Sequence, residues 1–367
     1  MADSQLSGLT SVQLLALANT QLEGLTSSQL KVMTDLQLNG LSSGQLSGLV
    51  NTQLNGLTSS QLSKLANTQL NGLSSDQLAG LADSQLSGLT SSQLTALANT
   101  QLDGISSAQL KALVGTQWTG MSSAQLAALV ATQLDGLTSW QISAFSTIQL
   151  KGLTSAQLGS WSDSQLNGLT SSQLRVLAVT QLSALTSGQL SGLATTQMAG
   201  FSSLQLKNLT DMQLDGLTAG QLSSLMNTQY SGLTSAQLGN LEDTQLDGLT
   251  TMQIGWLTTT QLTGLSANQI RGLSTDQIRA LTRTLVGSLT ITQIGGLTVT
   301  DIQSMTRTQI GALTGTQLAS LDASQVNSFS TTAGWTAAGL TTTQVNALNN
   351  LSGTANGSDP MSILWGV

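Results

Sequence analysis

Residues 10–25 read Thr-Ser-Val-Gln-Leu-Leu-Ala-Leu-Ala-Asn-Thr-Gln-Leu-Glu-Gly-Leu, which is two eight-residue units, or octads, of a pattern that repeats along the chain. Gln stands at the fourth place of every octad from Gln5 to Gln325, except where Leu285 and Asp301 replace it. The residue after this Gln is apolar, and the residue four after it is apolar almost throughout. Two apolar positions in a short fixed period predict a solenoid, in which each unit buries its apolar face against its neighbours.

The glycine pattern doubles this period. Gly follows Gln by three residues in alternate octads, as at Gly8, Gly24 and Gly40, whereas the octads between them often carry Ala, as at Ala16, or a larger residue. We therefore expect coils of two octads each, stacked into about twenty-two coils. Residues 1–329 form this solenoid, and residues 330–367 diverge from the pattern as a C-terminal cap, assembly segment or secretion segment.

The octads carry the signals of short helices. A Thr or Ser followed three residues later by Gln is a capping box, as in Thr10 with Gln13 and Thr26 with Gln29. We interpret the repeated Gln as a capping and inter-coil hydrogen-bonding residue, because a catalytic glutamine in every octad makes no chemical sense. Gly24 and Gly40 resemble left-handed C-terminal helix stops.

Two alternatives stay open at this level. In many of the second octads the capping place is taken by Ala or Val, as at Ala18 and Val50, so these octads are either helical or extended. A β-solenoid with ladders of Gln and Thr is the alternative to an α-rich solenoid. Interior positions rich in Leu, Gln and Ala, with few β-branched residues, favour the helical form.

Composition narrows the classes of function. Cys and His are absent, only 7% of residues are charged, and the net charge is −7. This composition disfavours thiol and imidazole catalysis, transition-metal sites and nucleic-acid binding. We expect no enzyme activity, no cofactor, no metal site and no transmembrane segment, since Ser, Thr, Gln or Gly interrupts every apolar run.

Two sets of surface residues are candidates for interactions. Trp140 and Ile148 directly precede the repeated Gln, a place usually held by a small or polar residue. With Leu204, Met212 and Met252 at the same place, they predict apolar patches for lateral association. A Thr array at this place, from Thr20 to Thr132, would suit ordered water or ice on a flat face, but Leu36, Ile148 and Met212 interrupt it.

The ends suggest self-assembly. The first octads are ordinary repeats, so Leu6, Leu9 and Leu14 would offer half of a stacking interface, with the C-terminal segment and Trp365 on the other side. We expect a homopolymer that joins end to end, with lateral association as a second mode of contact. To test the phase assignment, we expect Leu174→Asp to damage neighbouring coils and Gln173→Glu to be far milder.

The Thr/Ser-x-x-Gln-Leu/Ile/Val-x-x-Leu octads resemble the low-charge tandem repeats of bacterial surface and biofilm-associated proteins. Residues 99–105, Asn-Thr-Gln-Leu-Asp-Gly-Ile, are similar to the sixteen-residue repeats of bacterial ice-nucleation proteins, with Leu in place of the outward Thr and of the Tyr. These resemblances imply a non-enzymatic bacterial structural protein that forms an extracellular filament, sheath or matrix. The alternative is a rigid adhesin or spacer arm that contacts carbohydrate, mineral or ice. The location expected is extracellular or at the cell surface without a cleavable N-terminal signal, and a cytoplasmic location stays open.

Overall fold

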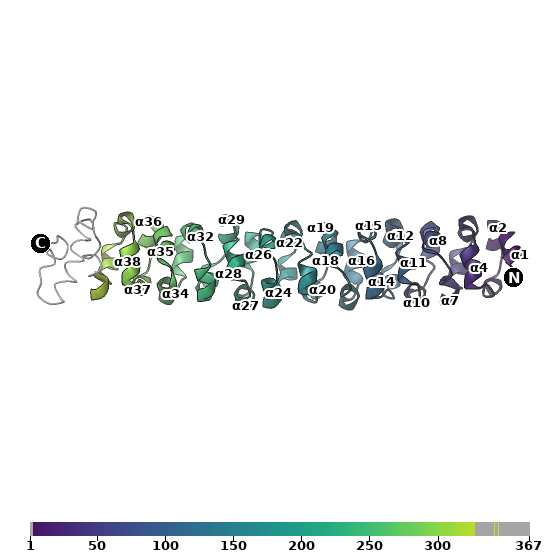
Figure 1. Ribbon diagram of the computed structural model, residues 1–367, viewed down its shortest axis with the longest axis horizontal. Coiled ribbons are helices and arrows are strands. Elements are labelled where there is room, and N and C mark those ends of the chain that lie inside the picture. Colours follow the sequence, from purple (N-terminus) through teal and green to yellow (C-terminus); the bar gives the residue numbers. More distant parts are fainter. Residues whose placement is uncertain (1–2, 327–340, 342–343, 345–367) are drawn as a thin grey trace, which may run out of the picture. The chain divides into compact units, whose positions relative to one another are not determined.

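The structure is a helical repeat solenoid. The computed structural model describes residues 3–326, 341 and 344, and every regular element among them is an α-helix of four to six residues, without any strand (Figure 1). The α-rich solenoid is therefore confirmed over the β alternative. Contacts divide the chain into two units at Leu185–Thr186, where the octad phase is unbroken. The expected boundary at residues 329 and 330 lies outside the described residues.

Each octad contains one helix. In the first unit the helices are α1 (Asp3–Ser7), α2 (Ser11–Leu15), α3 (Asn19–Leu22), α4 (Ser27–Val32), α5 (Asp35–Asn39), α6 (Ser43–Ser47), α7 (Asn51–Leu54), α8 (Ser59–Lys64), α9 (Asn67–Leu70), α10 (Ser75–Ala79), α11 (Asp83–Leu86), α12 (Ser91–Ala96), α13 (Asn99–Leu102), α14 (Ser107–Ala112), α15 (Gly115–Trp118), α16 (Ser123–Ala128), α17 (Ala131–Leu134), α18 (Ser139–Ser143), α19 (Thr147–Gly152), α20 (Ser155–Gly159), α21 (Asp163–Leu166), α22 (Ser171–Val176) and α23 (Val179–Leu182). In the second unit they are α24 (Ser187–Ser191), α25 (Thr195–Met198), α26 (Ser203–Lys207), α27 (Asp211–Asp215), α28 (Ala219–Ser223), α29 (Asn227–Tyr230), α30 (Ser235–Gly239), α31 (Asp243–Asp247), α32 (Thr251–Trp256), α33 (Thr259–Thr263), α34 (Ala267–Gly272), α35 (Thr275–Ala280), α36 (Arg283–Ser288), α37 (Ile291–Gly296), α38 (Val299–Ser304), α39 (Arg307–Ile310) and α40 (Gly315–Ala319).

The repeated Gln caps the start of its own helix. In α2, the Thr10 N–H donates to Gln13 Oε1 at 2.9 Å, and the Gln13 N–H donates to Thr10 Oγ1 at 3.3 Å. Thr26 and Gln29 form the same reciprocal pair at the start of α4, with distances of 3.0 and 3.2 Å. These bonds satisfy backbone donors that the first turn of a helix leaves without partners.

Octads without a capping hydroxyl are helical as well. The Ala18 N–H donates to Gln21 Oε1 at 2.9 Å, so the Gln half of the capping box persists in α3 although Ala18 offers no side-chain acceptor. An extended conformation for these octads is therefore wrong. The sixteen-residue sequence period survives as a difference in helix length in much of the first unit, where six-residue α8 is followed by four-residue α9 and six-residue α12 by four-residue α13.

The same Gln also caps the end of a distant helix. Gln61 Nε2 donates to the carbonyl oxygens of Leu30 at 3.1 Å and Met33 at 2.8 Å, at the end of α4 four octads earlier. A helix leaves its last carbonyl groups without intrahelical donors, and this amide supplies a donor for them. Equivalent bonds recur in both units, from Gln37 Nε2 to Leu6 O at 3.0 Å through Gln325 Nε2 to Leu297 O at 2.7 Å.

The coil is larger than the sequence period. Every pair of helices with extensive mutual contact is three helices apart, such as α2 with α5 and α34 with α37, while the Gln amides reach back four octads. One turn therefore takes between three and four octads, and the expected coil of two octads is wrong. The physical reason is size: helices about 10 Å across cannot enclose a core of Leu side chains when only two of them form a turn.

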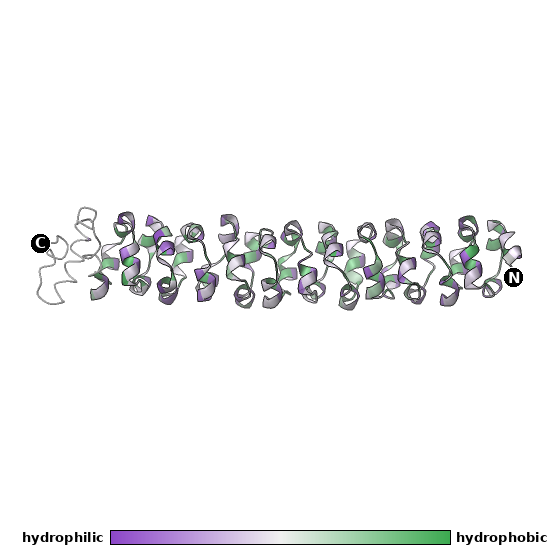
Figure 2. Cartoon of the chain, in the orientation of Figure 1, coloured by the Kyte–Doolittle hydropathy of each residue, from purple (hydrophilic) through white to green (hydrophobic). Residues whose placement is uncertain are grey.

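Both apolar positions of the octad form the core. Leu62 and Leu65 are typical, with 0% and 4% of their surface exposed, and the Gln residues from Gln29 to Gln181 are buried beside them. Most helices consequently carry hydrophobic and hydrophilic residues together (Figure 2). The first unit's Trp118 belongs to this core and lies 5.4 Å from Phe145 between ring centroids.

The glycines serve a purpose other than the one expected. Gly40 ends α5 with φ −75° and ψ −19°, which is right-handed helical geometry, so the left-handed stop is wrong; Gly24 has no left-handed φ either. A Cβ on Gly40 would lie 2.6 Å from Ser11 Cα, and one on Gly56 would lie 2.0 Å from Ser27 O. Gly24 is open, since its Cβ would meet only Gln21 O at 3.9 Å. Glycine therefore permits close approach between successive coils.

The two exceptions to the Gln rule keep a capped helix start but lose the bond between coils. Asp301 Oδ2 accepts the Thr298 N–H at 2.8 Å, and the Leu285 N–H still donates to Thr282 Oγ1 at 3.3 Å. A carboxylate only accepts hydrogen bonds and a Leu side chain makes none. These octads are thus capped at their own helix starts without an amide to donate to the preceding coil.

The structure reverses the expectation for Gln173→Glu. Gln173 Nε2 donates to Ile142 O at 3.1 Å and Phe145 O at 2.8 Å, and the side chain is buried. A carboxylate there would face two carbonyl oxygens, so we expect Gln173→Glu to lower the free energy of unfolding by about 3–5 kcal/mol at pH 7. Burial raises the pKa of the introduced carboxyl, so the folded state binds its proton more tightly. The deficit should be smallest at acidic pH and grow as the pH rises, measured by thermal unfolding.

Gln13→Glu is the matched control. Gln13 has the same capping box but is exposed, and the structure gives its Nε2 no carbonyl acceptor among the described residues. Glu preserves the capping oxygen, so the change should cost about 0.5 kcal/mol or less. Equal losses for the two variants would show that the bond between coils contributes little.

Gly56→Ala and Gly44→Ala test the close approach. A methyl group on Gly56 would overlap Ser27 O, and we expect a loss of about 1–3 kcal/mol or more. Gly44 lies inside α6, where the nearest atom to an added Cβ is Ser42 Oγ at 4.0 Å. Gly44→Ala should therefore stabilise the protein by about 0.5–1 kcal/mol. Thermal melts of both variants decide the matter, and a harmless Gly56→Ala would contradict the packing described.

Candidate functional site

The described residues offer neither a metal-binding cluster nor a membrane-spanning helix. No group of three or more acidic residues among them could hold a metal ion, and no helix in this part of the chain is long and apolar enough to cross a membrane. The buried Asp301 accepts hydrogen bonds from Thr298 as a helix cap. The sites that remain are surfaces.

The first coil presents unmatched hydrogen-bond donors. Gln13 and Gln21 are exposed, unlike Gln37 and Gln45, and the described part of the chain offers their Nε2 groups no carbonyl acceptor. Leu6 and Leu14, expected as exposed stacking residues, are instead buried, with 2% and 0% of their surface exposed. They are buried because neighbouring helices cover the position directly after the repeated Gln, in these octads as in the later ones. Only Leu9 of the expected set is partly exposed.

A scattered set of apolar side chains lies on the surface. Trp140 and Ile148 are 63% and 71% exposed, and Leu204, Met212 and Met252 are exposed as well. The Trp140 ring lies against Gly115, since a Cβ there would be 2.9 Å from the end of the indole. Trp365, the other expected assembly residue, lies outside the described residues.

The Thr residues do not form one flat face. Thr20, Thr52, Thr68 and Thr100 are all exposed, as an ice-contacting array would require. They occur in alternate octads, however, whereas helices that pack together are three apart. Thr52 and Thr68, two octads apart, therefore point in different directions around the coil. This arrangement disfavours a planar array for ice.

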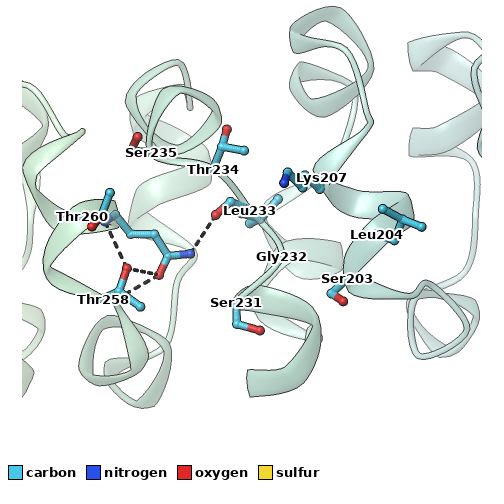
Figure 3. A pocket seen from close by; sticks show the side chains of 11 residues that line it. Ser203, Leu204, Lys207, Ser231, Gly232, Leu233, Thr234, Ser235, Thr258 and Thr260 are labelled. Atoms are coloured by element: carbon cyan, nitrogen blue, oxygen red, sulfur yellow. Dashed lines mark hydrogen bonds between the residues drawn. The ribbon is translucent and has the colours of Figure 1, made fainter.

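Two polar grooves occupy equivalent places in the repeat. In the second unit, a groove of about 530 Å³ is bounded by Lys207 and Leu204 of α26, the segment Ser231–Ser235 and the start of α33 (Figure 3). In the first unit, a groove of about 490 Å³ is bounded by Lys31 of α4, residues 55–59 and Gln85 of α11. Each groove is thus lined by three segments of the chain, each about three octads after the one before it.

The inter-coil Gln holds the walls of each groove together. Gln261 Nε2 donates to Leu233 O at 2.8 Å, and its Oε1 accepts the Thr258 N–H at 2.9 Å (Figure 3). In the first unit, Gln85 Nε2 donates to Leu57 O at 2.6 Å. Sequence reasoning missed these grooves because residues 24 and 32 positions apart become neighbours only when the coil contains more than two octads. With the correct coil size, the lysines and the hydroxyl groups around them could have been assigned to one surface.

Comparison with known proteins identifies a repeat. Residues 259–291 match a family model described as the ALTTAQ repeat. The matched length is about four octads, which is also the reach of the Gln amide. Read as amino-acid letters, Ala-Leu-Thr-Thr-Ala-Gln corresponds to the passage from the end of one octad through the cap to the Gln of the next. No curated protein matches the chain.

The core of the second unit contains one buried phenol. The Tyr230 hydroxyl is buried and meets no hydrogen-bond partner among the described residues, and burial raises the pKa of this phenol above its ordinary value of 10.0. Tyr230 is the only tyrosine in the chain. Its position in the Leu column, with 1% of its surface exposed, fits a core residue rather than a catalytic one.

Tyr230→Phe should stabilise the protein by about 1 kcal/mol, because it removes a buried polar group that makes no hydrogen bond. The gain should increase with pH. Above pH 10 the phenol ionises in the unfolded chain while the folded state keeps it neutral, so only the wild-type protein loses stability from this group. Thermal melts between pH 7 and 11 measure the difference, and a destabilised Tyr230→Phe protein would indicate that the hydroxyl has a partner.

Proposed function

We propose that this chain is a non-enzymatic structural protein that joins end to end into an extracellular filament, sheath or matrix. The observation that carries the proposal is the pair of exposed amides on Gln13 and Gln21. In later octads the same amide donates to carbonyl oxygens of the preceding coil. The first coil therefore has the donor half of the contact that holds the solenoid together.

A second copy can supply the acceptor half. The acceptors would be carbonyl oxygens of its last helix, α40, in place of those that the internal contact uses, and the contact would repeat the internal packing of each unit. Such an interface joins different surfaces of the two copies, and repetition of it gives an open filament. Exposed Val12 and Leu15, with partly exposed Leu9 and Leu17, would add apolar area to the joint.

Composition supports a structural role over catalysis. The chain lacks His and Cys and has few charges, so it offers no imidazole base and no thiol nucleophile. Its regular surface of Ser, Thr and Asn suits a material exposed to water, and the match to a repeat family is compatible with this use. A rigid spacer or adhesin arm is the alternative if the protein stays monomeric.

The double variant Gln13→Glu/Gln21→Glu tests the joint in the 367-residue chain. Glu keeps the capping oxygen in α2 and α3 but lacks the donor amide, so the fold should remain while association is lost. Sedimentation velocity should show wild-type assemblies that grow with concentration and a variant that remains monomeric. Electron micrographs should show filaments for the wild-type protein and none for the variant.

Added negative charge needs its own control. Asn71→Asp/Asn99→Asp introduces the same charge at two exposed positions, at the end of α9 and in α13, which make no extensive contact with α2 or α3, and should assemble normally. Wild-type protein that stays monomeric at high concentration, across pH and salt, would refute the filament and favour the spacer.

A further inference from the structure

The two polar grooves share one chemical design. Lys31 and Lys207 both stand two residues after the repeated Gln, and each is the only charged residue that lines its groove. The other lining groups are mainly hydroxyls, with Ser59 and Thr58 in one groove corresponding to Ser235 and Thr234 in the other. The same arrangement, one lysine ammonium group among hydroxyl groups, therefore occurs at two equivalent places of the repeat.

Glycine sets the shape of both grooves. A Cβ on Gly232 would lie 2.3 Å from Ser203 O, and Gly56 makes the matching approach to Ser27. The segment after each glycine consequently lies directly against the helix that carries the lysine. Lys207 and Leu204 lie on one side of this segment, and Thr258 and Thr260 lie on the other (Figure 3).

We propose that each groove binds a carboxylate-bearing sugar of an acidic polysaccharide. The lysine ammonium pairs with the sugar carboxylate, and the Ser and Thr hydroxyls exchange hydrogen bonds with the sugar hydroxyls. Exposed Leu204 adds an apolar surface for one face of the sugar ring in the second groove.

The chain contains a matched position that should not bind. Lys111 occupies the same octad place as Lys31, and α14 packs on α17 as α4 packs on α7. At the place of Asn55 and Ser231, however, this position carries Asp135, at the end of α17. A carboxylate at this place would repel an anionic ligand. The repeat thus provides its own negative control.

Binding of polygalacturonate, whose sugars each carry a carboxylate, tests the proposal by calorimetry at low salt. The wild-type protein should bind polygalacturonate and not neutral dextran, with affinity that falls as salt is added. Lys31→Gln/Lys207→Gln should weaken binding by about tenfold or more. Lys111→Gln should leave it unchanged. Binding of dextran sulfate in preference to polygalacturonate would overturn the carboxylate assignment.

Asn55→Asp offers a second variant that retains the fold. Asp103 and Asp135 occupy the same place after α13 and α17, so an acid is compatible with the octad. Combined with Lys207→Gln, it should weaken binding as much as loss of both lysines. Undiminished binding by both double variants would overturn the proposal. The measurement uses protein at concentrations where it is monomeric, so its result is independent of end-to-end joining.

Discussion

A single amide group connects the two ends of different helices, and the solenoid depends on it. A helix of four to six residues has too few internal hydrogen bonds to persist, because nucleation is unfavourable and both termini leave backbone groups without partners. Gln61 addresses both termini: its oxygen accepts the N–H at the start of α8, and its nitrogen donates to the carbonyls at the end of α4. The amide is the smallest side chain that can do both at this reach, since Glu cannot donate and Lys cannot accept.

This constraint explains which features the sequence could predict. The pairing of Thr10 with Gln13 is local, so the spacing of three residues was enough to predict the cap, and the apolar phase was enough to predict the core. The size of the coil was not predictable in the same way. Neither the alternation of Gly nor the sixteen-residue period shows how many octads separate Gln37 from its partner Leu6. That separation depends on the width of a helix and on the volume of Leu side chains that one turn must enclose.

Gly40 shows how one residue can support two interpretations. A glycine after a helix is typical of a left-handed stop, yet here it lies in right-handed geometry beneath a Ser of another coil. The groove at Lys207 was hidden for the same reason, since its walls come from residues of three separate octads. By contrast, the exposure of Trp140 needed only the octad phase, because a residue directly before a buried Gln on a short helix points outward.

The reach of the Gln amide also determines how such a chain responds to mechanical load. Each octad is held by the octads three and four places before it, and nothing in this pattern ties it to more distant ones. A pull on an end of a unit would therefore break the contacts of one octad, then of the next, without a single cooperative rupture. Every released octad would add about 27 Å of extended chain. A unit of this kind can lengthen in small, nearly equal steps and recover by re-docking the same octads in reverse order, which is the behaviour of an extensible tether.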